Sequence, residues 1–206
     1  MTGNRSSSID DEPGVGALGQ LGFTTVVGTD LATAAIALAA PEHGGGWSAA
    51  RAERLPFRDA SFRCVTSLDV IEHLDDDVAG LREYRRVVEP GGLVVLAVPA
   101  YRWAWSDHDD ALGHRRRYTR RSLRHSAEAA GLTVERITYF HSWLVPAAWI
   151  FRRTPARRLL RGAAEEASYV GPGVNRFLAA VSGGERRVLR RMDLPFGLSI
   201  LAVARR

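Results

Sequence analysis

The sequence contains no lysine, a single cysteine and no apolar run long enough to cross a membrane. The one cysteine, Cys64, cannot form an internal disulfide, which excludes a disulfide-stabilised scaffold and indicates a reducing compartment. The uncharged run Ile137–Phe151 is about five residues too short for a membrane span and contains Pro146. The first residues lack the apolar segment of a secretory signal. We therefore expect a cytoplasmic protein without a transmembrane helix.

The composition is that of an ordinary globular protein. Of its 206 residues, 46% are hydrophobic and 25% are charged, which excludes a wholly disordered or fibrous chain. This length suits one domain, so we predict a single domain over residues 1–206, with a poorly defined start over residues 1–20.

Charge is distributed unevenly along the chain. Residues 1–80 hold 5 arginines against 12 acidic residues, whereas residues 81–206 hold 23 arginines against 11 acidic residues. The basic part indicates either an anionic partner, such as a phosphorylated substrate or a membrane surface, or a set of solvated helix faces. Because no recognisable nucleic-acid-binding motif accompanies the charge, we expect no nucleic-acid partner.

Short apolar runs alternate with stretches of helical periodicity, which predicts an α/β sheet. The run Leu93–Val98 is apolar on both faces, as expected for a strand in the middle of a covered sheet. We predict strands over residues 24–29, 47–52, 62–68, 93–98, 132–140 and 195–204, and helices over residues 31–40, 76–88, 119–130, 142–164 and 174–191.

Four segments occur in an order and spacing that resemble a known enzyme family. They are Val26–Asp30 (VVGTD), Ala52–Phe62 (AERLPFRDASF), Ser67–Leu74 (SLDVIEHL) and Leu81–Gly92 (LREYRRVVEPGG). Together they resemble the class I S-adenosylmethionine-dependent methyltransferases, in the branch that includes quinone-biosynthesis enzymes. The resemblance implies a Rossmann-like sheet with helices on both faces, S-adenosylmethionine as cofactor, and transfer of its methyl group to an acceptor.

The resemblance also implies a cofactor-binding set. An acid at the carboxyl end of a strand, here Asp30, can accept two hydrogen bonds from a ribose diol. The same residue is equally suited to cap the helix that follows, and one carboxylate can serve both purposes. Leu68 and Asp69 end the third predicted strand and would face the same crevice. The full cofactor-binding set is Gly14, Gly16, Asp30, Leu31, Ala52, Glu53, Leu68 and Asp69.

The beginning of the chain departs from the family pattern. Family members open with an apolar strand, an acid and a Gly-x-Gly turn. Gly14 and Gly16 match the turn, but the preceding Ser6–Ile9 would make a poor buried strand. We therefore predict that the first strand is irregular or missing. This degenerate start also supports an alternative function, that of a catalytically inactive methyltransferase-like protein that binds a partner or a membrane.

The segment Pro99–Tyr118 follows the strand after which family members build their acceptor site. The resemblance implies that this acceptor-side loop and a helical insertion lie within residues 99–195. It further implies acceptor contacts from Tyr101, Arg117 and Tyr118, to a small-molecule or lipid-linked acceptor.

Two histidines are candidate bases, because histidine titrates near neutral pH and a hydroxyl or protonated amine must lose a proton on methylation. His114 is either such a base or a solvated loop residue, and His73 is either a base or a structural residue at a helix start. Asp107, His108 and Asp109 are reminiscent of metal ligands. Adjacent side chains rarely converge on one ion, however, so we expect no metal from this run.

Two further features have alternative interpretations. The arginines between residues 115 and 124 would either hold a phosphate or carboxylate of the acceptor or form a solvated helix start. The apolar segment Tyr139–Phe151, followed by basic residues, would either make peripheral contact with a membrane or form a core helix.

Overall fold

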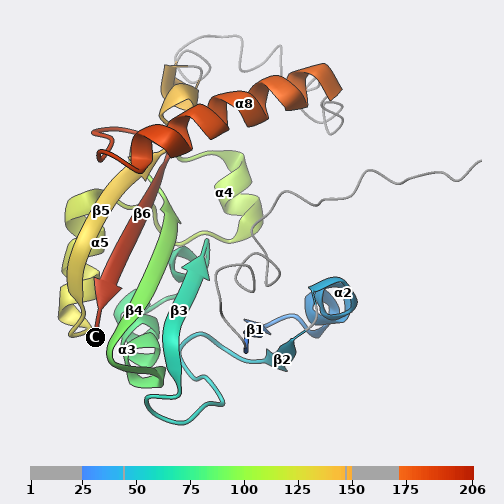
Figure 1. Cartoon of the computed structure of the whole chain (residues 1–206), viewed down its shortest axis with the longest axis vertical. Coiled ribbons are helices and arrows are strands. Elements are labelled where there is room, and N and C mark those ends of the chain that lie inside the picture. The colour runs from blue at the N-terminus through green and yellow to red at the C-terminus, as the bar shows by residue number, and fades with distance from the viewer. Residues whose placement is uncertain (1–24, 44, 147, 150–171) are drawn as a thin grey trace, which may run out of the picture. The chain divides into compact units, whose positions relative to one another are not determined.

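The computed structural model describes residues 25–43, 45–146, 148–149 and 172–206 (Figure 1). The chain divides into two compact units, residues 1–56 and 57–206. The predicted single domain stays a prediction, and so does the irregular first strand, because residues 1–24 lie outside the described part.

The described residues of the first unit form a small parallel sheet and one helix. Strand β1 (Val27–Asp30) pairs in parallel with β2 (Gly46–Ala49), and helix α2 (Thr33–His43) connects them. The sequence predicts a buried strand here, but the residues of β1 are half-buried or exposed, because β2 is its only partner among the described residues. The helix also continues through Pro41, where we predicted its end. Pro41 stands in the last turn, so it removes one backbone donor from the end of the helix, which stops two residues later at His43.

The second unit is built on a four-stranded mixed sheet with the order β3-β4-β6-β5. Strands β3 (Phe62–Leu68) and β4 (Val88–Pro99) are parallel. Strand β6 (Ser199–Arg205) runs antiparallel to both β4 and β5 (Thr133–Phe140). The α/β fold class predicted from the sequence is therefore confirmed.

Strand β4 forms the centre of this unit because its side chains are apolar on both faces. Val94, Leu96 and Val98 are fully buried, and β3 and β6 flank the strand. The strand begins five residues earlier than the predicted Leu93. It includes Pro90, and the register against β3 shifts at this point, so the Pro-Gly-Gly run bends a strand rather than separating a helix from one.

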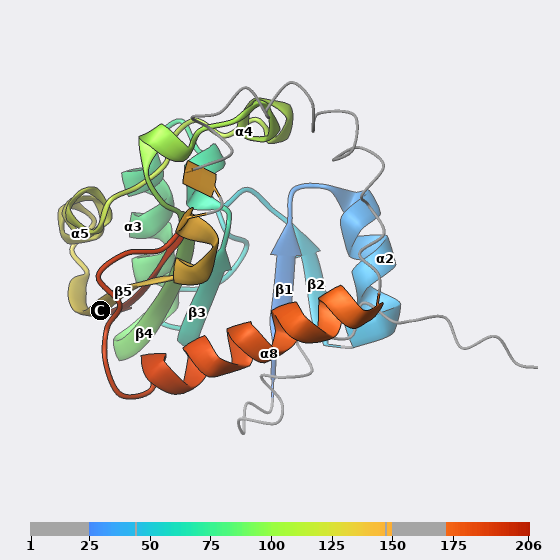
Figure 2. The same ribbon diagram turned by 90° about the horizontal axis from the view of Figure 1, so that it is seen from above.

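Two helices pack against the sheet and against each other: α3 (Asp77–Val87) and α5 (Arg120–Ala129) (Figure 2). Side-chain caps fix where they begin, since Asp76 accepts from the Ala79 amide and Thr119 accepts from the Ser122 amide. Leu81 and Leu123 are fully buried and join the two helices to the core. Both helices match the predicted ranges to within one residue at each end.

Helix α8 (Pro172–Leu189) is joined to the end of β5 through one carboxylate. Glu185 accepts hydrogen bonds from the backbone amides of His141 and Ser142, each at 2.8 Å. The predicted helix over residues 142–164 begins with a short 3-10 turn at Ser142–Leu144, and most of its remaining residues lie outside the described part. Among the described residues, no helix combines the length and apolar character needed to span a bilayer.

Candidate functional site

Two connections meet where the parallel strands β3 and β4 end. The first, after β3, contains a 3-10 turn at Ile71–His73. The second, after β4, contains another at Arg102–Ala104 and a short helix, α4 (Asp107–Leu112). In open α/β sheets, ligands bind outside the carboxyl ends of parallel strands. The candidate site of the second unit therefore lies at these connections.

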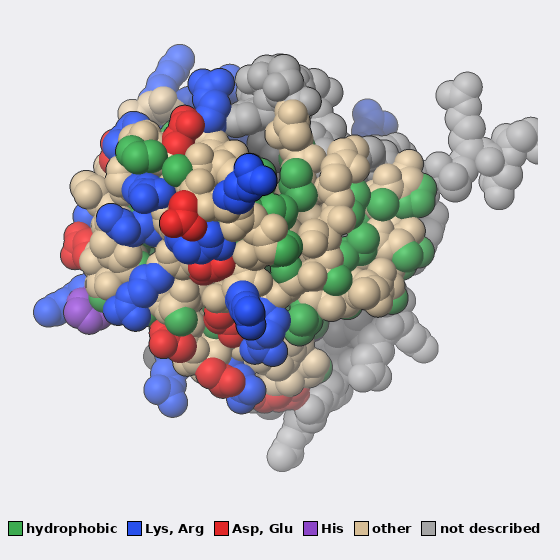
Figure 3. Space-filling model, turned by 90° about the horizontal axis from the view of Figure 1, so that it is seen from below, with side chains coloured by type: hydrophobic (Ala, Val, Ile, Leu, Met, Phe, Trp, Pro, Cys, Tyr) green, Lys and Arg blue, Asp and Glu red, His purple; other side chains and the backbone are tan. Residues whose placement is uncertain are grey.

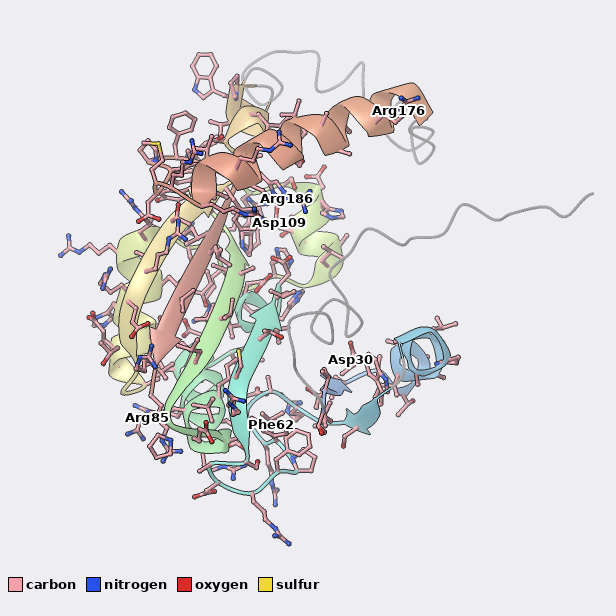
Figure 4. The ribbon with its side chains drawn as sticks, viewed as in Figure 1. Asp30, Phe62, Arg85, Asp109, Arg176 and Arg186 are labelled. Atoms are coloured by element: carbon pink, nitrogen blue, oxygen red, sulfur yellow. The ribbon has the colours of Figure 1, made fainter. Side chains whose placement is uncertain are left out.

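Asp109, on α4, is the centre of a hydrogen-bonded cluster (Figure 4). Its carboxylate is fully buried and accepts bonds from Arg117 (Nε, 2.7 Å; Nη2, 3.0 Å), from His114 (Nδ1, 2.8 Å) and from the amide and hydroxyl of Ser106 (2.7 and 2.9 Å). Burial alone would raise the pKa of Asp109, but the hydrogen bonds from Arg117, His114 and Ser106 outweigh it and hold the pKa below its usual range. Asp109 therefore carries a negative charge that orients both His114 and Arg117.

Local sequence explains how α4 presents these groups. Ser106 and Asp109 form a capping box at the start of the helix. Gly113 ends it in a left-handed conformation (φ 73°), and the following amide of His114 returns to the Asp109 carbonyl at 2.9 Å. The turn brings the His114 ring back beside the Asp109 carboxylate.

His114 and His73 come together although 41 residues separate them. Their rings meet edge to face, with centroids 4.6 Å apart and planes at 82°. The His114 side chain is only 9% exposed, and its Nδ1 is held by Asp109, so its Nε2 is the nitrogen available for chemistry. The structure thus brings together the two histidines predicted as candidate bases.

Glu72 completes this group of side chains. Its carboxylate is fully buried, and neither oxygen has a hydrogen-bond partner among the described residues. Burial, together with the neighbouring Asp69 carboxyl, raises the pKa of Glu72 to about 8. A ligand-binding oxygen or nitrogen from each of Glu72, His73 and His114 lies within 4.8 Å of the others. We call Glu72, His73, Asp109, His114 and Arg117 the acid–histidine cluster.

The polar groups of Arg117 and Tyr118 are hydrogen-bonded to other residues of the protein. Arg117 makes two bonds to Asp109 and a third to the Ala100 carbonyl at 3.0 Å. Tyr118 is 2% exposed, and its hydroxyl donates to the buried carboxylate of Asp77 at 2.9 Å. This geometry favours a supporting role for both residues over the acceptor contacts that we predicted from the sequence.

Tyr101 lies in a stack of aromatic rings. Its ring is 5.1 Å from that of Tyr139 and 5.6 Å from that of Trp103 between centroids, in both cases nearly parallel. Its backbone has a positive φ of 58°, which turns the chain sharply after β4. Burial, followed by the neighbouring Tyr139, raises the pKa of Tyr101 to about 12. Trp103 is 46% exposed, so part of this stack faces solvent.

The arginines between residues 115 and 124 are largely paired within the protein. Arg116 donates to Asp77 at 2.7 Å, and Arg115 lies 3.3 Å from Asp75. Figure 3 shows arginines interspersed with carboxylates over one face of the molecule. An open hollow on the surface is lined by Arg120, Arg121, Arg124, Glu135, Arg136, Ile137 and Asp193. These contacts favour the interpretation of a solvated helix start over that of an acceptor-binding cluster.

The predicted cofactor residues are divided between the two units. Asp30 ends β1 and is exposed, and one of its carboxylate oxygens accepts from the Ala32 amide at 2.7 Å. Helix α2 begins only at Thr33, so this bond closes the turn before the helix, and the predicted capping of a helix from Leu31 is not observed. Leu31 is exposed, and Ala52 and Glu53 form a half-buried turn. All of these lie in the first unit.

In the second unit, Leu68 ends β3 and is 48% exposed. Asp69 follows it with a positive φ of 49°, and burial of its carboxyl raises its pKa. Gly14 and Gly16 lie outside the described residues. The roles of all of these residues toward a cofactor stay predictions.

Sequence reasoning did not select two members of the acid–histidine cluster for the site. From the sequence, Asp109 belongs to the run Asp107-His108-Asp109, for which we expect no metal, although the Ser106-x-x-Asp109 spacing before Gly113 indicates a short capped helix. Glu72 stands within the family-like segment Ser67–Leu74 and receives no separate role. An acid directly after the apolar pair Val70-Ile71, and directly before a histidine, was the available signal.

Residues 14–96 match the methyltransferase domain family. Among solved structures, the fold resembles phosphoethanolamine N-methyltransferase 2 from Haemonchus contortus in complex with S-adenosyl-L-methionine (TM-score 0.56, 16% identity, 94% of this chain and 47% of that one). It also resembles an S-adenosylmethionine-dependent methyltransferase from Mesorhizobium loti (TM-score 0.54, 17% identity, 94% and 88%). A third relative in fold is the cyclase SpnF (TM-score 0.55, 21% identity, 88% and 66%). The family match covers residues 14–96 of the 206, and the likeness to these solved structures shows a shared fold.

Proposed function

We propose that this protein transfers a methyl group from S-adenosylmethionine to a hydroxyl or amine of a small or lipid-linked acceptor. The domain match over residues 14–96 and the methyltransferase fold support the reaction type. The observation that carries the proposal is the pair His73 and His114 beyond the ends of β3 and β4, with His114 oriented by the buried Asp109.

The residues present suit such a cofactor. Asp30 offers an exposed carboxylate at the carboxyl end of a parallel strand, which is the chemistry that a ribose diol requires. Leu68 offers an exposed apolar surface at the end of β3, which suits a flat adenine ring. When bound, S-adenosylmethionine supplies a methyl group on a positively charged sulfur, which is reactive without further activation by the protein.

The protein's own task is then to align the acceptor and to take its proton. We propose that Nε2 of His114 accepts the proton from the acceptor oxygen or nitrogen as the new bond to the methyl carbon forms. Asp109, held by Arg117, stabilises the resulting imidazolium through Nδ1. We propose that His73, which is half-buried, passes the proton on to solvent. Of the three predicted acceptor contacts, we retain Tyr101, because its ring stack offers a partly exposed aromatic surface.

The test measures formation of S-adenosylhomocysteine from S-adenosylmethionine in the presence of a panel of hydroxyl and amine acceptors, both small and lipid-linked. We expect one acceptor class to raise the rate above the acceptor-free value. His114→Ala should lower that rate about a hundredfold or more, the usual contribution of a general base. His125→Ala, an exposed histidine on α5, is the matched control and should not change it. A folded protein that no acceptor stimulates, or a fully active His114→Ala variant, would contradict the proposal and favour a binding protein without turnover.

A further inference from the structure

We propose that Glu72, His73 and His114 form a binding site for a single divalent metal ion of the zinc type. The inference starts from their convergence: one ligand atom of each lies within 4.8 Å of the other two. The three side chains come from two different connections, a 3-10 turn after β3 and the segment after α4, so the fold and not local sequence brings them together.

The unpartnered carboxylate of Glu72 is the second observation. It is fully buried, yet neither oxygen accepts a hydrogen bond within the described structure. A buried carboxylate without partners is costly, and proteins normally satisfy it with donors or with a cation. The Arg117 guanidinium, a cation whose charge acts on Glu72, is committed to Asp109 and to the Ala100 carbonyl. A metal ion would supply the missing positive charge.

The contacts around His114 are those of a metal-binding histidine. Its Nδ1 is hydrogen-bonded to the Asp109 carboxylate at 2.8 Å, which sets the ring orientation and directs the lone pair to Nε2. Asp109 is itself held by Arg117 and Ser106, so the ring is fixed before any ion binds. Such carboxylate–histidine pairs orient metal ligands in proteins and raise their basicity.

The donor set decides which ion fits. Two imidazole nitrogens and one carboxylate oxygen are a known three-ligand set for Zn²⁺, which leaves a fourth tetrahedral position open. Bond lengths of 2.0–2.2 Å place tetrahedral ligands about 3.3 Å apart. The ligand atoms of Glu72, His73 and His114 lie within 4.8 Å of one another, so each pair must approach by at most about 1.5 Å to reach this distance. His73 is less buried than Glu72, and His114 is fixed by Asp109, so we assign most of this movement to His73.

An ion in this position would use the same His114 nitrogen that otherwise takes the proton of the acceptor. With the ion bound, coordination of an acceptor hydroxyl oxygen in the fourth position would lower the pKa of that hydroxyl, and its proton would pass to solvent water. This last consequence rests on the proposed function, whereas metal binding itself does not.

The test is calorimetric titration of the metal-free protein with Zn²⁺ alone, with Co²⁺ as a second probe whose visible absorption reports tetrahedral coordination. We expect one equivalent to bind, and we expect Glu72→Gln and His73→Ala each to weaken binding at least tenfold. His125→Ala should bind as the unchanged protein does. Glu72→Gln keeps the size of the side chain, and circular dichroism will verify that each variant is folded.

Absence of binding, or equal affinity in the Glu72→Gln variant and the unchanged protein, would overturn the metal site. The two proposals fail separately. If the protein binds Zn²⁺ but transfers no methyl group to any acceptor, the metal site is supported and the proposed function is refuted. If the protein binds no Zn²⁺ and its methyl transfer is unaffected by a chelator, the proposed function is supported and the metal site is refuted.

Discussion

Replacing Asp109 by asparagine should destabilise the protein more than any other single polar substitution in α4. Asp109 is fully buried, and the side chain of its partner Arg117 is only 13% exposed. Asparagine keeps the volume and can still accept from Ser106, but it removes the charge and cannot accept both bonds from Arg117. Because breaking a buried pair leaves the other charge uncompensated, we expect a loss of about 3 kcal/mol in the free energy of unfolding.

The assay is urea unfolding followed by tryptophan fluorescence, since four of the five tryptophans lie after residue 57. At a typical dependence of about 2 kcal/mol per molar urea, the midpoint should fall by about 1.5 M. Asp110→Asn is the matched control. Asp110 is on the same helix and accepts from Trp105 at 3.0 Å, but the bond is exposed, so we expect a loss below about 1 kcal/mol.

A double-mutant cycle separates the ion pair from other effects. If Asp109 and Arg117 act as one unit, then Asp109→Asn combined with Arg117→Met should cost clearly less than the sum of the two single changes. Additive losses, or an Asp109→Asn variant as stable as Asp110→Asn, would refute the role of Asp109 as the centre of the cluster.

Three further predictions concern other parts of the chain. Asp30→Ala should weaken S-adenosylmethionine binding at least about tenfold in calorimetry, since two charge-assisted hydrogen bonds would be lost, and unchanged affinity would remove Asp30 from the ribose role. Burial raises the pKa of Tyr118 above its ordinary 10.0, so the folded chain keeps a proton that the unfolded chain loses. Tyr118 should therefore lower the free energy of unfolding by about 1.4 kcal/mol for each pH unit above pH 10. In urea unfolding at several pH values, the Tyr118→Phe variant should lose less stability between pH 10 and higher pH than the unchanged protein does. A Cβ at Gly197 would collide with the Phe140 carbonyl, so Gly197→Ala should lower the free energy of unfolding by about 2 kcal/mol or more. Gly184 lies on a helix with open space around it, so Gly184→Ala should raise the free energy of unfolding by about 0.5–1 kcal/mol; thermal unfolding measures both.

Much of the second unit was predictable from hydrophobic patterning. The range predicted for β3 is the one observed, and α3 and α5 differ from their predicted ranges by about one residue, because caps such as Asp76 and Thr119 mark where a helix begins. Helix α4 was not predicted. It has six residues and a polar composition, and its stability comes from the capping box and from tertiary bonds to Asp109.

The candidate site was predictable only in part, because its contacts join residues far apart in sequence. The sequence indicated His73 and His114 separately but could not show that their rings meet. It likewise could not show that the Tyr118 hydroxyl is bonded to Asp77, 41 residues away, which decides between a supporting role and an acceptor contact. The burial of Glu72 depends on the packing of both connections, for which the preceding apolar pair Val70-Ile71 is only a weak local signal.

The central claim, that this protein uses S-adenosylmethionine, is tested most directly by calorimetric titration of the purified chain with S-adenosylmethionine and S-adenosylhomocysteine. The account predicts binding of one equivalent of each with a dissociation constant in the micromolar range, about −8 kcal/mol. A folded chain that gives no binding heat with either ligand at high concentration would contradict it.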